Sequence, residues 1–289
     1  ELDRLNLADL AFNSPLPTNP RAQSGEDAPH LLSQTTREKN LQGRIISDVE
    51  VILPPWRFIP AGPFWMGSDR VRDKDATDSE LAEFSINVAP FAIALYPVTV
   101  QEYTLAVKGN IVKAPQNNHI SWEEQMQHPS HPVVNVSWYD AIAYTQWLSA
   151  LTEQIWRLPT EIEWEKAAKA DQKYIYPWGN KWKAGLANTK EENVKTTSTI
   201  GAYPQGASPY LIYDLIGNVG EWCHSKMEPY PYQTPAIPVL EASDKRIIRG
   251  GSWNSTHLEA RITARRDHFP EIIAPTFGFR LVLDIANAL

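Results

Sequence analysis

The chain has 289 residues, 43% of them hydrophobic, and a formal net charge of −7 at pH 7. This apolar content is enough for a folded core, which excludes extensive disorder, and the negative charge argues against nucleic acid as a partner. No apolar run approaches the ~20 residues that cross a bilayer, so no membrane span is expected. The single cysteine, Cys223, excludes an internal disulfide and a Cys/His zinc cage and favours a reducing, cytoplasmic location.

Residues 1–44 are polar and rich in turn-forming residues, without hydrophobic periodicity. They are predicted to be a linker or a peripheral arm, and residues 45–289 are predicted to form the folded domain. The opening ELDRLNLADL has neither an initiator Met nor a signal-peptide core. We therefore expect a piece of a longer protein, with upstream domains and any targeting signal outside it.

The first folded segment, RIISDVEVILPPWRFIPAGPFWMGSD (residues 44–69), alternates apolar and polar residues and predicts two short strands joined by a Gly turn. The mixed charges of DRVRDKDATDSE (residues 69–80) are typical of a solvated loop.

Three helices are predicted from their N-terminal caps. Thr99 with Glu102 and Thr160 with Glu163 have capping-box spacing, and Ser137 precedes an amphipathic run. The helices follow these caps at residues 100–107, 161–170 and 138–152. His128 and His131 lie between prolines in HPSHP, which is typical of a turn beside a helix and not of a metal site.

Residues 174–244 are predicted to be mostly loop, and the C-terminal segment returns to strand-like alternation. So long a loop is uncommon unless it binds ligands or metals. The predicted class is α+β, with few helices, short antiparallel strands and much ordered loop.

Eight motifs occur in one order: FIPAGPFWMGS, YPVTVQEY, HPVVNVSWYDAIAYTQWLS, RLPTEIEWEKAAKA, YPWGN, YDLIGNVGEWC, RGGSW and FGFRLV. In this order they resemble the formylglycine-generating-enzyme-like (sulfatase-modifying factor) family over residues 52–284. The resemblance implies a C-type-lectin-like fold. Function does not follow from the fold, because it depends on the site.

Active members of that family bind copper and activate oxygen with two cysteines after the GGS turn. Aligned with this chain, the two cysteines fall at Ser255 and Ala260, and neither residue has a thiol. Cu(I) needs soft thiolate ligands, so we expect no copper and no catalytic residues. The alternative is a metal-dependent oxidase or modifying enzyme with different site residues.

The resemblance also implies structural calcium in the loops, where hard oxygen ligands suit Ca²⁺. The predicted ligands fall in two groups: Asp214, Gly217, Val219 and Glu221, and Asn188, Thr189, Glu192 and Val194. The alternative is that the carboxylates fix turns through backbone N–H groups.

Some proteins of the family that this sequence resembles catalyse no reaction. These are the variable proteins of diversity-generating retroelements, which display a hypervariable patch between RGGSW and GFR. Here an apolar, aromatic segment in that region predicts a surface that binds a protein ligand. The predicted surface comprises Asn254, Ser255, Thr256, His257, Leu258, Asp267, His268, Phe269, Ile272, Ile273, Ala274 and Pro275. Packing of these side chains on the framework is the alternative. A regulatory or interaction domain of a multidomain protein is a third reading.

Four arginines lie near this segment: Arg261, Arg265, Arg266 and Arg280. They fit either an anion site or bidentate pairs with buried carboxylates such as Glu221, and the sequence favours the second.

Overall fold

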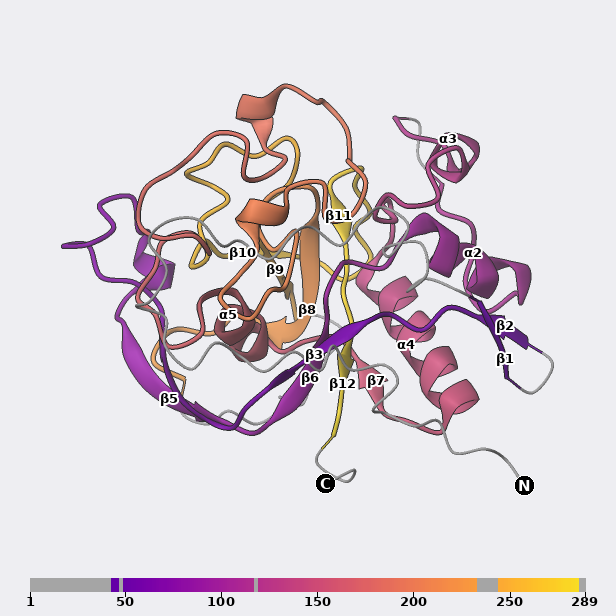
Figure 1. Cartoon of the computed structure of the whole chain (residues 1–289), viewed down its shortest axis with the longest axis horizontal. Coiled ribbons are helices and arrows are strands. Elements are labelled where there is room, and N and C mark those ends of the chain that lie inside the picture. Colours follow the sequence, from indigo (N-terminus) through magenta and orange to yellow (C-terminus); the bar gives the residue numbers. More distant parts are fainter. Residues whose placement is uncertain (1–42, 47–48, 117–118, 233–243, 286–289) are drawn as a thin grey trace, which may run out of the picture.

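The computed structural model describes residues 43–46, 49–116, 119–232 and 244–285 (Figure 1). The predicted arm, residues 1–44, lies outside the described residues except for its last two. Arg44 belongs to strand β1 (Arg44–Ile46), so among the described residues a strand includes the last residue of the predicted arm.

The three predicted helices are confirmed, because each cap works as its sequence spacing requires. Helices α2 (Val100–Lys108), α4 (Trp138–Thr152) and α5 (Glu161–Lys169) each begin with a capping box. In each box the side chain of the cap residue accepts the N–H of the third helical residue, and the carboxylate of that residue accepts the N–H of the cap. Both groups would otherwise lack a partner inside the helix.

The part of the chain that the structure describes contains a further helix, α3 (Trp122–Met126), which was not predicted, although Ser121 and Glu124 form the same capping box. Short 3-10 turns occur at η2 (Asp78–Glu80), η3 (Lys190–Glu192) and η4 (Pro204–Gly206). In residues 174–219, part of the stretch predicted to be mostly loop, the 3-10 turns η3 and η4 are the helical elements that the structure describes.

The lower sheet in Figure 1 is antiparallel and has the order β3-β6-β12-β7. Its strands are β3 (Trp56–Ile59), β6 (Phe91–Ala94), β12 (Val282–Leu283) and β7 (Trp156–Arg157). It therefore joins the start of the domain to its end. β4 (Gly62–Met66) pairs with β5 (Phe84–Val88), and β1 pairs with β2 (Val49–Val51). Residues 44–69 thus contain four strands, and the prediction of two was wrong, because the prolines at 54 and 55 separate additional short strands.

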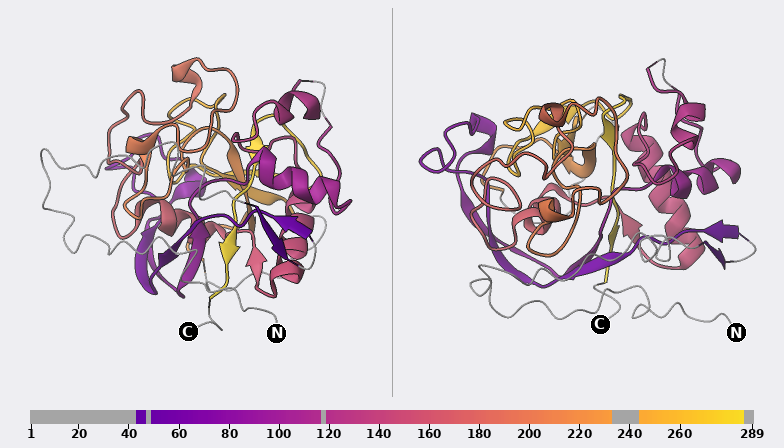
Figure 2. Two further views of the ribbon diagram at one scale, coloured as in Figure 1. Left: turned by 45° about the vertical axis from the view of Figure 1, so that its right-hand side comes forward. Right: turned by 45° about the horizontal axis from the view of Figure 1, so that its top comes forward.

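The second sheet has the order β10-β9-β8-β11 and supports the loops above it (Figure 2). Its strands are β8 (Gly220–Lys226), β9 (Arg246–Arg249), β10 (Arg266–His268) and β11 (Phe277–Gly278), of which β11 runs parallel to β8. β8 lies inside the stretch predicted to be mostly loop. Residues 233–243 of that stretch lie outside the described residues.

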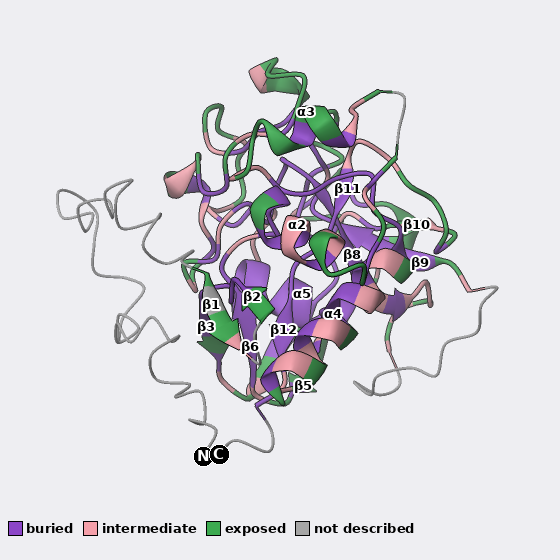
Figure 3. Cartoon of the chain, turned by 90° about the vertical axis from the view of Figure 1, so that its right-hand side faces the viewer, coloured by how far each residue is buried: buried purple, intermediate pink, exposed green. Residues whose placement is uncertain are grey.

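Two clusters of buried side chains form the core. Figure 3 shows the buried residues in purple. The first, here the α4 cluster, contains Tyr103, Tyr144, Trp222 and Phe279 among others. The second, the α5 cluster, contains Phe64, Trp164 and Cys223 among others. Both bury aromatic side chains, each of which removes a large apolar area from water. No helix in the described residues is both long enough and apolar enough to span a bilayer.

Candidate functional site

The glycine turn after β9 folds the chain back sharply. Gly250 and Gly251 have φ values of +91° and +68°, a region that side chains disfavour. A β-carbon on Gly251 would lie 2.8 Å from Cβ of Ala260 and 3.2 Å from Cβ of Ser255. Only glycine fits there, and the turn brings together the two positions that the resemblance assigns to the family's cysteines.

No thiol is present at these positions. Ser255 is 3% exposed and Ala260 is fully buried. The N–H of Ser252 donates to Oγ of Ser255 at 3.1 Å, and a cavity of about 20 Å³ lies beside both serines. This volume is sufficient for about one water molecule. The inclusion of Ser255 in the exposed surface was wrong, because its hydroxyl is turned inward to hold the turn.

Cys223 lies on β8 and is also fully buried. Burial raises the pKa of its thiol well above the ordinary value. A thiolate is the form that binds metals and attacks electrophiles, so this cysteine is inert in the folded chain.

The tail segment from β10 to β11 carries exposed apolar side chains. Phe269 is 46% exposed, and Ile272 and Ile273 are 39% and 38% exposed. Residues 254–258 are the other stretch of the predicted surface. In it Leu258 is 41% exposed, and Asn254 is also exposed. Apolar side chains in one segment that remain in water are typical of an interaction surface.

Backbone hydrogen bonds fix the tail segment to the framework. The carbonyl of Pro270 accepts the N–H of Trp138 at 2.9 Å, where α4 begins. The carbonyl of Ala274 accepts the N–H of Asn135 at 3.0 Å, and that of Pro275 accepts Nε1 of Trp253 at 3.0 Å. The exposed side chains therefore project from a fixed backbone, which lowers the entropy lost on binding.

The remaining tail positions are only partly exposed. Asp267 pairs with Lys245 at 3.3 Å, and the ring of His268 lies 5.1 Å from that of Phe277. Ala274 packs against the α4 cluster. Some of these side chains therefore pack on the framework, which is the alternative to a binding surface that the sequence left open.

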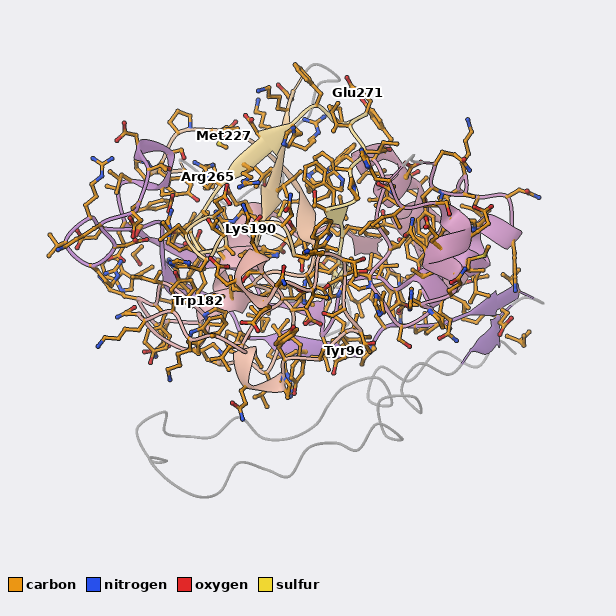
Figure 4. All side chains as sticks on the ribbon, turned by 90° about the horizontal axis from the view of Figure 1, so that it is seen from above. Tyr96, Trp182, Lys190, Met227, Arg265 and Glu271 are labelled. Carbon is orange, nitrogen blue, oxygen red and sulfur yellow. The ribbon has the colours of Figure 1, made fainter. Side chains whose placement is uncertain are left out.

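The stretch of residues 254–258 is fixed to the framework through His257. Its ring stacks on Trp182 at 5.4 Å, and its Nδ1 lies 2.7 Å from Oε1 of Glu191. Figure 4 labels Trp182 and Lys190, the residue that precedes Glu191 in the sequence. Partial burial raises the pKa of Glu191, but hydrogen bonds from His257 and Thr189 outweigh it and lower the pKa to about 2. Thr256, the remaining residue of this stretch, is partly exposed.

The first predicted calcium group has its carboxylates engaged by protein donors. Both oxygens of Glu221 accept hydrogen bonds from Arg280 at 2.6 Å, and Oε2 also accepts Nε1 of Trp164 at 2.7 Å. Asp214 accepts the N–H of Gly201 at 2.5 Å. Gly217 and Val219 lie between these two residues in the sequence and are buried. These contacts match the alternative in which the carboxylates fix the structure, and they do not support Glu221 as a ligand.

The second predicted group keeps one oxygen that suits a cation. Asn188 is 1% exposed and donates through Nδ2 to the carbonyl of Thr196 at 2.9 Å. Its Oδ1 is buried and has no hydrogen-bond partner among the described residues. A buried unpaired oxygen is costly, and Ca²⁺ would satisfy it.

Of the other predicted ligands, Thr189 is buried and Val194 is exposed. Glu192 accepts the N–H of Gly185 at 2.7 Å. No group of three or more His, Cys, Asp or Glu side chains in the described part of the chain is arranged to hold a metal.

Three of the four arginines are buried and paired with carboxylates. Arg261 lies 2.6 Å from Asp73 and 2.7 Å from Glu80, and Arg265 lies 2.7 Å from Glu161. Asp73 and Glu80 are therefore buried, and the prediction of a wholly solvated loop at residues 69–80 was wrong for them. The charges pair across the fold, as the buried-pair interpretation requires.

These features, a glycine-closed turn on a small sheet under ordered loops, define an α+β domain of the C-type-lectin-like class. The sulfatase-modifying factor enzyme 1-like domain matches residues 48–285, so the chain belongs to that family.

Relatives with and without activity are found. A Bos taurus protein named inactive Cα-formylglycine-generating enzyme 2 is 30% identical over 278 residues, covering 77% of this chain and 85% of that protein. The hercynine oxygenase of Mycolicibacterium smegmatis is 29% identical over 259 residues, covering 73% of this chain and 59% of the oxygenase. The chain thus spans less than two thirds of the oxygenase.

Two solved structures share the fold. PvdO from Pseudomonas aeruginosa superposes with a TM-score of 0.71 and 26% identity, covering 80% of this chain and 94% of PvdO. The Treponema denticola variable protein 1 superposes with a TM-score of 0.66 and 20% identity, covering 84% and 98%. The second likeness concerns the fold alone.

Proposed function

We propose that this domain is a non-catalytic binding module that presents the tail segment and residues 254–258 to a protein ligand. The observation that carries the proposal is the turn at Gly251. It brings Ser255 and Ala260 together where active relatives would have their thiols, and no thiol is present. Without soft ligands the site has nothing to hold Cu(I).

The exposed apolar side chains support the binding role. Phe269, Ile272 and Ile273 remain in water on a backbone fixed by hydrogen bonds. Burying such side chains against a partner contributes about 25 cal/mol per Å² of apolar area. The Bos taurus relative named as inactive supports the view that the family contains members without catalysis.

Partner binding by the full chain tests the proposal. We expect a triple change, Phe269→Ser with Ile272→Ser and Ile273→Ser, to abolish cross-linking to the partner in an extract of the source cells. Ile155→Ser is the matched control, because Ile155 is 53% exposed but lies beside β7. Equal cross-linking by the wild type and the triple variant would contradict the proposal.

The alternative is an atypical metal-dependent oxidase, which the similarity to a hercynine oxygenase favours. Oxygen uptake and metal analysis of the purified chain distinguish the two. Stoichiometric copper or iron with oxygen uptake would support the enzyme, whereas calcium alone would fit the binding module. We further propose structural calcium at Asn188, and a reducing, cytoplasmic location for the domain.

The retroelement origin is part of the same proposal. A near-copy of the DNA that encodes residues 249–280, beside a reverse transcriptase gene, is the expected genomic context. A chromosomal locus without either element would remove hypervariability from the proposal and leave the binding role intact.

A further inference from the structure

A second cavity, of about 280 Å³, opens between α3, the turn at 127–134 and Thr197. Its lining includes Val100, Ile120, Glu124, His128, His131 and Val134. This volume is at the low end for small-molecule sites, so it suits one side chain or a fragment. None of the residues discussed as a catalytic, calcium or recognition site lines it.

Two stacked imidazoles form one wall. The rings of His128 and His131 lie 4.7 Å apart at 29°, and Nδ1 of His131 lies 3.0 Å from Oγ1 of Thr197, which fixes that ring. Burial, together with the neighbouring His128, lowers the pKa of His131 to about 4, so its ring is neutral at pH 7. A neutral planar ring is a surface on which a planar cation stacks.

Besides the two imidazoles, the cavity is lined by a carboxylate and by apolar side chains. Glu124 is exposed, and the hydrogen bonds that its carboxylate accepts from Ser121 lower its pKa, so it is ionised. Among the described residues that line the cavity, Glu124 has the carboxylate side chain, and no lysine or arginine is among them. Val100 and Val134 are each 1% exposed and offer apolar contact to methylene groups.

The cavity adjoins the tail segment. Val134 lines the cavity, and the next residue, Asn135, donates its N–H to the carbonyl of Ala274 at 3.0 Å. In Figure 1, α3 lies at the top of the molecule, as do the loops above β8–β11. The cavity wall and the backbone of the tail segment are therefore neighbours in the fold.

We propose that this cavity binds a guanidinium group, presented by an arginine side chain of the protein partner. The planar cation stacks on the imidazoles, its N–H groups pair with Glu124, and its methylenes cover the valines. The assignment to a partner rests on the proposed function, whereas the guanidinium site itself does not.

Small probes test the site without the partner. We expect N-acetyl-arginine N-methylamide to shift the ring signals of His128 and His131 in NMR titrations. The matching citrulline compound has the same shape without the charge and should bind about tenfold more weakly or worse. Equal affinities for the two compounds would overturn the proposal.

Variants locate the charge. Glu124→Gln keeps an oxygen for the cap of α3 and should weaken arginine binding about tenfold, with the His131 signal of the free protein unchanged. Glu123→Gln is the control, because Glu123 is exposed on the same helix and does not line the cavity. Wild-type affinity in Glu124→Gln would contradict the assignment.

The source of the guanidinium is tested separately. Free arginine should bind no more tightly than the capped compound, and a tenfold preference for free arginine would assign the site to the amino acid instead of a partner. Arginine binding that persists while the tail variants leave partner cross-linking unchanged would refute the proposed function and keep the guanidinium site.

Discussion

Burial decides what each ion pair contributes in this molecule. Arg280 and Glu221 are both fully buried and bidentate, and the arginine also donates to the carbonyls of Ala94 and Tyr213. Arg266 and Glu259 form a pair of similar length, but their side chains are 43% and 46% exposed. Solvent screens the exposed pair, whereas the buried pair has no water to replace a lost partner.

Arg280→Met should therefore cost about 3–5 kcal/mol of the free energy of unfolding, because Glu221 would stay buried without its cation. Arg266→Met should cost less than about 1 kcal/mol. Urea unfolding followed by tryptophan fluorescence measures both. Similar costs for the two variants would show that Glu221 gains water or a proton when Arg280 is removed.

The two positions that the resemblance assigns to the family's cysteines allow a second test at the residue scale. Ser255→Cys together with Ala260→Cys should create a Cu(I) site, because both β-carbons lie within 3.2 Å of one point beside Gly251. Competition with a chromogenic Cu(I) chelator measures it. Each single variant should compete at least about tenfold less well, since one thiolate is lost. Equal competition by single and double variants would place the family's cysteines elsewhere.

Among the helices, α2 has a cap that is sensitive to pH. Burial raises the pKa of Glu102 to about 7, although its hydrogen bonds from Thr99 act in the opposite direction. The folded state therefore holds the proton more tightly than the unfolded state. The contribution of Glu102 to stability is complete below about pH 4.5 and is lost as the pH rises to about 7.

The change Glu102→Gln should remove this decline, so the variant gains on the wild type by roughly 2–4 kcal/mol between those pH values. Unfolding free energies measured at half-unit pH steps give the difference. Glu124→Gln is the control at the exposed cap of α3, where the pKa is lowered and no such gain is expected. A difference that is flat with pH would show that Glu102 stays ionised in the fold.

The elements that could be predicted from the sequence are those that begin with a short motif of neighbouring residues. Thr99, Ser137 and Thr160 each precede a carboxylate three residues later, and all three helices begin there. Ser121 carries the same signal before α3, so that helix could have been found. Pairing of strands distant in sequence, such as β3 with β6, depends on packing that no short motif encodes.

The candidate site divides in the same way. Exposed Phe269, Ile272 and Ile273 follow from an apolar run without periodicity. The inward turn of Ser255 and the burial of Asp73 depend on contacts with distant segments, Asp73 with Arg261 across 188 residues. A charge that pairs across the fold looks the same in the sequence as a solvated one.

At the scale of the whole molecule, β8 connects the two core clusters. Its neighbouring residues alternate across the sheet, so that Trp222 packs in the α4 cluster and Cys223 in the α5 cluster. Trp222 also donates Nε1 to the carbonyl of Val136 at 3.0 Å, and the carbonyl of Cys223 accepts Nε1 of Trp138 at 3.0 Å. Displacing β8 would therefore disrupt both clusters, which predicts that they unfold as one cooperative unit.

The single cysteine makes this prediction measurable. The thiol of Cys223 should react with a disulfide reagent only through global unfolding, so the urea dependence of labelling should equal that of equilibrium unfolding. Leu258→Cys with Cys223→Ser supplies an exposed control thiol, since Leu258 is 41% exposed, and it should react without delay in water. Labelling of Cys223 that depends weakly on urea would reveal local opening of β8. The α5 cluster would then separate from the α4 cluster before either unfolds.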